Sequence, residues 1–204
     1  MSLLRGTSTG LALWRFSTST LTPAGATPDK IALAVLGVSG AERWSYARLT
    51  AAVGAVAAGL AAQGIRPGDR VALRLPNAVD LPVAFLAAAW IGAVPVLIPE
   101  PWTVPEIRAV LDIVAPAAIV ADAGLPRPED AGPVHSIEAL AEGASNPGPP
   151  SDLGSPDRPG YIVFTSGTTA LPKGVILSQR NLCFVVERVA ASLDLRPSDR
   201  CGLA

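Results

Sequence analysis

Strand-like and helix-like stretches alternate along most of the chain. From residue 29, short apolar runs rich in valine, isoleucine, leucine and alanine are separated by longer, alanine-rich segments of helical character. The short runs predict strands at residues 31–35, 70–75, 94–98 and 117–121. The longer segments predict helices at residues 46–63, 81–93 and 104–114.

Residues that favour helix ends stand between these segments. Ser45 is placed to cap the first helix, and Gly64 suits its C-terminal end. Either Asn77 or Asp80 is expected to cap the second helix. Pro105 suits the first turn of the third helix, where a missing N–H is tolerated.

The alternation of strands and helices indicates the fold class. Strands joined by helices predict βαβ units with right-handed crossovers and a parallel sheet. The strands are almost continuously apolar, which fits burial on both faces. The sequence therefore predicts an α/β fold, a doubly wound and mostly parallel sheet with helices on both faces.

The second half of the chain begins with a different composition. Residues 124–160 are dense in proline, glycine, aspartate and serine, and we interpret them as a long surface connection with one brief helix at 136–142. His135, the single histidine, lies there and is expected to be solvated, without a functional role. A strand is predicted at 161–165, and extended chain at 175–177.

A last helix is expected after these strands. Ser178 is placed to cap a helix over residues 179–193. Leu182, Val185, Val186 and Val189 recur at a spacing of three and four and predict its apolar stripe.

Hydropathy and charge limit the class of protein. Mean hydropathy is +0.40 and only 16% of residues are charged, so the chain buries a sheet on both faces, enters a membrane, or covers apolar surface with further protein. The uncharged run at 81–99 is divided by Gly92 and Pro95 into a helix and a strand, which predicts no integral membrane span. A net charge of -1 gives no electrostatic footprint for nucleic acid.

The remaining composition predicts one segment boundary and a cellular compartment. Residues 1–28 are expected to form an N-terminal arm or helix, and residues 29–204 the α/β domain. The first segment also has the Arg, Ser and Thr content and lack of acids typical of a mitochondrial transit peptide. Two cysteines form no disulfide framework, so a reducing cytoplasmic location is expected, with mitochondria as the alternative.

The chemistry is concentrated at residues 165–174, Thr-Ser-Gly-Thr-Thr-Ala-Leu-Pro-Lys-Gly. Hydroxyls and free backbone N–H groups bind phosphate oxygens, glycine lets the backbone approach, and a lysine neutralises charge. This order is not that of a Walker A loop, because Lys173 is followed by glycine and not by Ser or Thr. The candidate phosphate-binding residues are Thr165, Ser166, Gly167, Thr168, Thr169 and Lys173.

Residues 161–175 resemble the signature loop of the adenylate-forming superfamily, which includes acyl-CoA synthetases, luciferases and the adenylation domains of peptide synthetases. The resemblance runs from about residue 28 to residue 200, and it implies that residues 29–204 are the N-terminal portion of an AMP-binding (adenylation) domain, truncated. Further similar segments follow in the family's order at 44–49, 64–72, 75–77, 90–96 and 199–200. Two positions depart from the pattern: Ala170 stands where glycine is usual, and Gln179 where histidine is frequent.

The resemblance implies an ATP-dependent acid–thiol ligase that activates a carboxylic acid as acyl-AMP and transfers it to coenzyme A. ATP, Mg²⁺ and coenzyme A are the implied cofactor and co-substrates. The loop would hold the β- and γ-phosphates, and the catalytic residues are expected beyond Ala204, in a separately encoded C-terminal part or a lost continuation. The alternatives are a non-catalytic nucleotide-binding or interaction protein derived from such a ligase, and a fragment of a peptide-synthetase adenylation domain.

Overall fold

The structure is a computed structural model of the 204-residue chain, and it describes residues 27–37, 40–142, 155–165, 172–196 and 198–199. Two strands form an antiparallel hairpin, β1 (Ile31–Gly37) and β2 (Gly40–Ser45). The other strands form one six-stranded sheet in the order β6-β5-β3-β4-β7-β8. They are β3 (Arg70–Arg74), β4 (Val94–Leu97), β5 (Ala118–Ala121), β6 (Val134–His135), β7 (Pro159–Thr165) and β8 (Lys173–Ser178).

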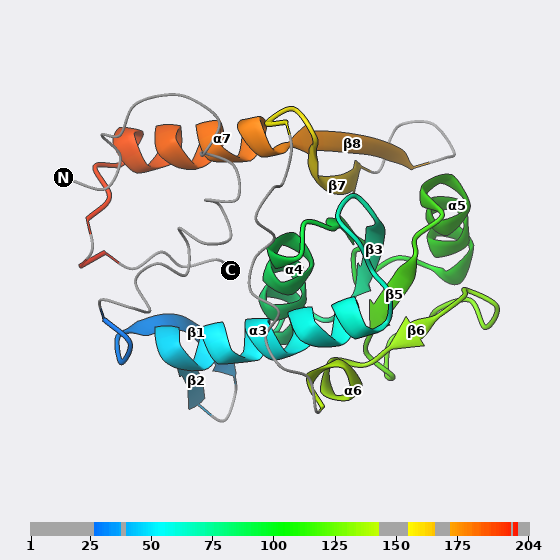
Figure 1. Cartoon of the computed structure of the whole chain (residues 1–204), viewed down its shortest axis with the longest axis horizontal. Coiled ribbons are helices and arrows are strands. Elements are labelled where there is room, and N and C mark those ends of the chain that lie inside the picture. The colour runs from blue at the N-terminus through cyan, green and yellow to red at the C-terminus, as the bar shows by residue number, and fades with distance from the viewer. Residues whose placement is uncertain (1–26, 38–39, 143–154, 166–171, 197, 200–204) are drawn as a thin grey trace.

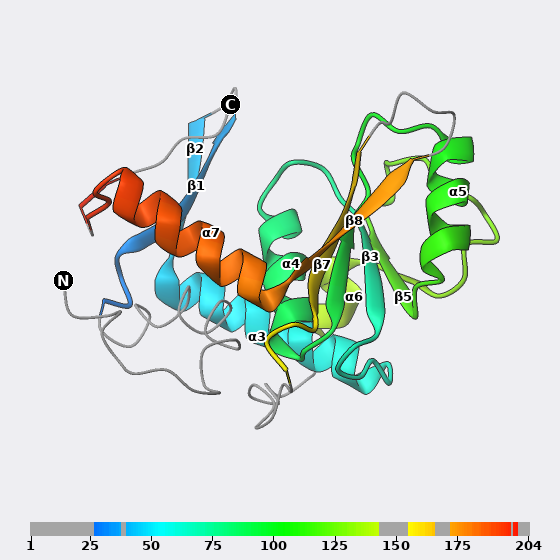
Figure 2. The same ribbon diagram turned by 90° about the horizontal axis from the view of Figure 1, so that it is seen from above.

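Helices connect the strands of this sheet and flank it. They are α3 (Tyr46–Ala62), α4 (Asp80–Trp90), α5 (Val104–Val114), α6 (Ile137–Ala141) and α7 (Gln179–Ser192). Helix α5 lies on one face of the sheet, and α3, α4 and α6 lie on the other (Figures 1 and 2). The first five strands in the sheet order are parallel, whereas β8 is antiparallel to β7.

The order of the strands contains a reversal at β3. The chain passes from β3 through α4 to its neighbour β4, then through α5 to β5 on the other side of β3. Right-handed crossovers in opposite directions place α4 and α5 on opposite faces. This is the doubly wound arrangement, so the predicted fold class is confirmed.

Two hydrophobic cores fill the spaces above and below the sheet. Because side chains alternate along a strand, Val71 and Leu73 of β3 enter the core with α3 and α4, and Ala72 enters the core with α5. All three side chains are fully buried. The burial of both faces explains why the strands are apolar throughout.

Several predicted helix ends are confirmed. The Ser45 hydroxyl accepts a hydrogen bond from the Arg48 N–H at 3.2 Å, and Gly64 follows the end of α3 with a left-handed φ of +84°. Thr103 and Glu106 form a capping box before α5.

The structure corrects the sequence analysis at three places. Neither Asn77 nor Asp80 caps α4: its N-cap is Val79, without a side-chain hydrogen bond, and Asp80 is the first helical residue. Strand β2 lies where no strand was expected, and β1 pairs with it and not with the parallel sheet. The connection at 124–160 contains β6, so His135 pairs with Val120 at the edge of the sheet.

The uncharged run at 81–99 forms a helix and a strand of the globular core. Most of α4 is buried against the sheet and α3, and β4 lies between β3 and β7. Among the described residues, none of the helices has the length and apolar content required to cross a membrane.

Gly59 allows α3 and α6 to approach closely. A Cβ at Gly59 would lie 2.0 Å from the Leu140 carbonyl oxygen, which is far inside van der Waals contact. We expect Gly59→Ala to lower the free energy of unfolding by about 1–3 kcal/mol, although alanine favours helix. Urea denaturation monitored by circular dichroism measures this difference. The control is Ala51→Gly at an exposed position of α3, where removal of the methyl is the destabilising change. A more stable Gly59→Ala variant would contradict the close approach.

A second prediction concerns the pKa of Asp80 and its effect on stability. Burial raises the pKa of Asp80 above its ordinary value of 3.8, and the carboxylates of Glu138, Asp122 and Glu42 raise it further. The folded state therefore holds this proton more tightly than the unfolded state does. As a result, the contribution of Asp80 to the free energy of unfolding decreases as the pH rises from 3.8 through the raised pKa.

We expect Asp80→Asn to have a higher Tm than the wild type at about pH 7 and an equal Tm at about pH 3, where both side chains are neutral. Thermal unfolding at a series of pH values measures this. Glu129→Gln, at an exposed loop position, is the control and should show no such divergence. An Asp80→Asn variant that loses stability at neutral pH would show that the ionised carboxylate is favourable there.

Candidate functional site

Strand β7 brings the predicted phosphate loop to the carboxyl edge of the sheet. β7 is parallel to β4, with Ile162 opposite Val96. Along β7, Ile162 and Phe164 are buried, whereas Thr165 at the end of the strand is exposed. Open α/β sheets bind their ligands at the carboxyl ends of the strands, so the loop leaves β7 at the expected edge.

Thr165 and Lys173 are paired with each other on β7 and β8, the two strands that flank the loop. β8 is antiparallel to β7, and the register pairs Thr165 with Lys173 and Phe164 with Gly174. We refer to these four paired residues as the loop stem. Both Thr165 and Lys173 are exposed, and within the described residues Lys173 forms no ion pair. The stem thus brings together one hydroxyl residue and one ammonium group at the sheet edge.

The other predicted phosphate-binding residues, Ser166, Gly167, Thr168 and Thr169, lie outside the described residues, and so does Ala170. Their roles stay predictions. The described geometry of the site is that of the stem and of the groups that support it.

Gly174 is required for close contact within the stem. Its φ is not in the left-handed region, so a tight turn does not explain the glycine. A Cβ at this position would lie 3.1 Å from Cε1 and 3.2 Å from Cζ of Phe164. The Phe164 ring therefore lies directly against the backbone of the residue that follows Lys173.

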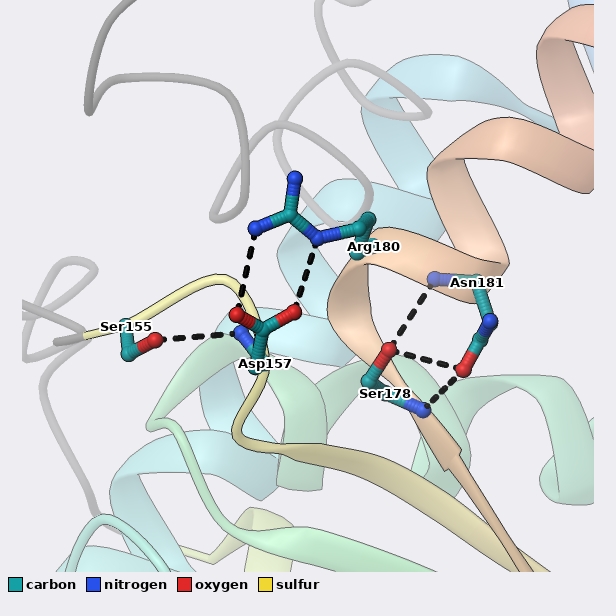
Figure 3. A network of polar contacts seen from close by, with 5 residues as sticks. All are labelled: Ser155, Asp157, Ser178, Arg180 and Asn181. Atoms are coloured by element: carbon teal, nitrogen blue, oxygen red, sulfur yellow. Dashed lines mark hydrogen bonds and ion pairs between the residues drawn. The ribbon is translucent and has the colours of Figure 1, made fainter.

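Polar contacts fix the other end of the β7–β8 pair (Figure 3). The Asn181 side-chain oxygen accepts a hydrogen bond from the Ser178 N–H at 3.0 Å, while the Ser178 hydroxyl accepts one from the Asn181 N–H at 3.2 Å. Arg180 donates from Nε and Nη2 to the two carboxylate oxygens of Asp157, at 2.7 and 3.1 Å. These hydrogen bonds hold the pKa of Asp157 below its ordinary value.

Backbone contacts join the start of α7 to the segment before β7. The Gln179 N–H donates to the Arg158 carbonyl and the Arg180 N–H to the Pro156 carbonyl, both at 3.1 Å. Gln179 is 4% exposed, so the residue that stands where the family often has histidine is enclosed by protein. The capping box at Ser178 confirms the predicted helix start.

Sequence reasoning missed one buried cation at the same edge of the sheet. Arg74, the last residue of β3, is fully buried, and burial lowers its pKa while the charge of Glu100 opposes this. It donates hydrogen bonds to carbonyls of Pro99, Trp102 and Pro126, in the connections that follow β4 and β5. The available signal was an arginine at the carboxyl end of a strand whose three central residues are apolar.

The described residues contain no group of three or more histidine, cysteine, aspartate or glutamate side chains placed to hold a metal ion. The stem itself offers a hydroxyl, an ammonium group and backbone atoms. These groups fit phosphate oxygens.

Comparison with known proteins agrees with this geometry. Residues 22–203 match the family described as AMP-binding enzyme. The chain is 35% identical over 172 residues to a long-chain-fatty-acid–CoA ligase, FadD13, of Mycobacterium tuberculosis, covering 78% of this chain and 34% of that protein. It is 32% identical over 154 residues to enterobactin synthase component F of Escherichia coli, covering 75% of this chain and 12% of that protein.

Solved structures share the fold. The o-succinylbenzoate CoA synthetase of Bacillus subtilis, bound with the product analogue OSB-NCoA, superposes with a TM-score of 0.78 at 26% identity, over 92% of this chain and 38% of that one. The N-terminal subdomain of Klebsiella oxytoca NpsA gives a TM-score of 0.68 at 25% identity, over 82% of this chain and 42% of that one.

The chain spans about a third of the length of the long-chain-fatty-acid–CoA ligase that it matches. Both CoA ligases and a synthase of the enterobactin type are among its relatives, at about 30% identity. Because the family match covers nearly the whole chain, including both strands of the loop stem, this protein belongs to the AMP-binding, adenylate-forming enzyme family.

Proposed function

We propose that this chain supplies the phosphate-binding part of an ATP-dependent acid–thiol ligase. In this reaction an oxygen of a carboxylate attacks the α-phosphorus of ATP, the bond to the bridging oxygen breaks, and pyrophosphate leaves with the electron pair. The thiolate of coenzyme A then attacks the carbonyl carbon of the acyl-AMP, and AMP leaves. Because the chain spans only part of its relatives, the complete reaction is proposed for the assembled enzyme.

The observation that carries the proposal is the register of the loop stem. Pairing of Thr165 with Lys173 fixes where the loop leaves and re-enters the sheet, at the edge where α/β folds bind ligands. We propose that Thr165, Ser166, Gly167, Thr168, Thr169 and Lys173 hold the β- and γ-phosphates and stabilise charge on the leaving pyrophosphate. In this proposal Mg²⁺ enters with the phosphates of ATP.

The acid and the acceptor thiol are proposed by analogy with the relatives. Long-chain-fatty-acid–CoA ligase and 4-chlorobenzoate–CoA ligase are both among them, which supports a carboxylic acid substrate and coenzyme A as acceptor. The match to enterobactin synthase component F supports the second candidate, an adenylation domain of the peptide-synthetase type. A cytoplasmic location is part of the proposal.

The partner in the assembled enzyme is proposed from an exposed apolar surface. Most of the exposed large hydrophobic residues of the described chain lie on β8, on α7 or just after α7. We define these residues as the α7 face: Val175, Ile176, Phe184, Val185, Val186, Val189, Leu193 and Leu195. Exposed apolar side chains concentrated on two consecutive elements indicate a protein interface.

β8 is also an edge strand, so it presents unpaired backbone groups beside this apolar surface. The relatives extend well beyond the part that this chain matches. We therefore propose that the α7 face packs against a polypeptide that supplies the rest of the adenylate-forming fold. Of the predicted apolar stripe of the last helix, Val185, Val186 and Val189 are exposed, whereas Leu182 is half-buried beside Gly160.

The phosphate role is tested by ATP binding. We expect Lys173→Ala to weaken the affinity for ATP·Mg²⁺ by roughly 10- to 100-fold, because it removes a charge-assisted contact to phosphate. Isothermal titration calorimetry on the wild type and the variant measures this. The control is Lys30→Ala, which removes the other lysine of the chain, outside the loop, and should bind as the wild type does. Equal affinities for wild type and Lys173→Ala would refute the assignment of the loop.

The exposed apolar face is tested by surface substitution. We expect the double variant Ile176→Thr and Phe184→Gln to bind less of a hydrophobic fluorescent dye and to self-associate less, with a Tm within a few degrees of the wild type. Both side chains are more than half exposed, at 61% and 56%. The control is Leu36→Gln in β1, also exposed but outside the α7 face. A large decrease in the Tm of the double variant would show that these side chains are packed in the isolated chain.

A further inference from the structure

We propose that Trp102 and Phe164 form a platform that positions the loop stem, and that the buried Arg74 holds this platform in place. All three act as positioning residues for the phosphate-binding loop. The inference rests on the proposed function, since it concerns how well the loop holds the phosphates of a nucleotide.

The first step is the attachment of Trp102 to the sheet. Arg74 is fully buried, and its hydrogen bonds go to backbone carbonyls. Its Nη2 donates to the Trp102 carbonyl at 3.2 Å, its Nε to the Pro126 carbonyl at 3.3 Å, and its Nη1 to the Pro99 carbonyl. The guanidinium is planar, with its donors in fixed directions. One side chain therefore fixes two connections at the carboxyl edge and sets the position of the Trp102 backbone.

The second step is the contact between the two rings. The Trp102 ring meets the Phe164 ring edge to face, with centroids 6.2 Å apart and an interplanar angle of 72°. This lies within the preferred range for such pairs. Both residues pack in the core between the sheet and α5, where Phe164 is only 5% exposed. Contact with Trp102 thus helps to set the position of the Phe164 ring.

The third step is the contact between Phe164 and both strands of the stem. Phe164 directly precedes Thr165 in β7, and its ring lies against Gly174, which directly follows Lys173 in β8. A shift of this ring displaces both strands at the point where the loop begins and ends. Small displacements of groups that hold a substrate have large effects on binding and rate.

The chain offers a matched control on the same strand. Phe85 of α4 meets Tyr161 of β7 edge to face, with centroids 5.7 Å apart and an angle of 70°. This second pair has similar geometry, but Tyr161 lies nearer the start of β7 and pairs with Leu177, far along β8 from Lys173. Loss of the Phe85 ring therefore removes an equivalent contact of β7 without reaching the stem.

The test compares affinities for ATP·Mg²⁺ and for magnesium pyrophosphate in the full chain. We expect Trp102→Leu to weaken both by roughly 3- to 10-fold, and Trp102→Phe, which keeps an aromatic edge, to retain most of the affinity. Phe85→Leu should lower the Tm by an amount similar to Trp102→Leu and leave both affinities within about twofold of the wild type. Affinities come from titration calorimetry and Tm values from thermal unfolding.

The outcomes separate the two proposals. If Lys173→Ala weakens binding and Trp102→Leu does not, the platform is refuted and the phosphate role stands. If Trp102→Leu and Phe85→Leu weaken binding equally, the aromatic pair has only a structural role and the platform is refuted. The platform is also refuted if Trp102→Phe loses as much affinity as Trp102→Leu. If the wild type binds neither ligand, or Lys173→Ala binds as the wild type does, the proposed function itself fails.

Discussion

The candidate site depends on the two different pairings of β7. On one side β7 is parallel to β4, and this pairing places its carboxyl end at the ligand edge of the sheet. On the other side it is antiparallel to β8, and this pairing returns the chain to the same edge after the loop. A parallel neighbour cannot bring both ends of a short connection to one edge, because parallel strands need a long crossover. The change from parallel to antiparallel pairing at β7 is therefore what allows a short loop with both ends at the site.

Strand β3 links the centre of the sheet to both cores and to the connections at its carboxyl edge. Alternate residues of β3 contribute to the cores on both faces, and its last residue, Arg74, joins the connections after β4 and β5. In doubly wound sheets the reversal of strand order opens a crevice at this edge. Here the buried guanidinium ties the two connections together at that point. The exposed groups of the candidate site are then those of the loop stem, on the β7 side of the sheet.

Local signals explain what could be predicted from the sequence. Ser45 and Ser178 cap helices as expected because a hydroxyl bonded to the N–H three residues later is a contact within one turn. The strands of the parallel sheet were recognisable because burial on both faces makes them apolar. Strand β2 was not, since it lies in a hairpin with charged, exposed positions such as Glu42 and Arg43. Strand β6 has two residues, too short for any periodicity.

The parts of the site that could not be predicted are non-local contacts. The loop was recognisable by its hydroxyls, glycines and lysine, which are neighbours in the sequence. The role of Arg74 was not, because its partners are 25, 28 and 52 residues away in the chain. The same holds for the contact of the Phe164 ring with Gly174, which depends on the register of two strands. Composition predicts a phosphate loop, whereas tertiary contacts determine the position of its stem.

In helix α7 the local capping signal and the tertiary contacts can be distinguished. Its start is fixed by the capping box at Ser178 and by the ion pair of Arg180 with Asp157, next to the base of the β7–β8 pair (Figure 3). These contacts do not involve Val185, Val186 and Val189 of the apolar stripe, which lie further along the helix and are exposed. The helix is therefore oriented by its first turn, and its stripe remains available to other protein. Because the anchored end lies between the stripe and the loop stem, further protein that packs on the stripe can do so without displacing Thr165 and Lys173.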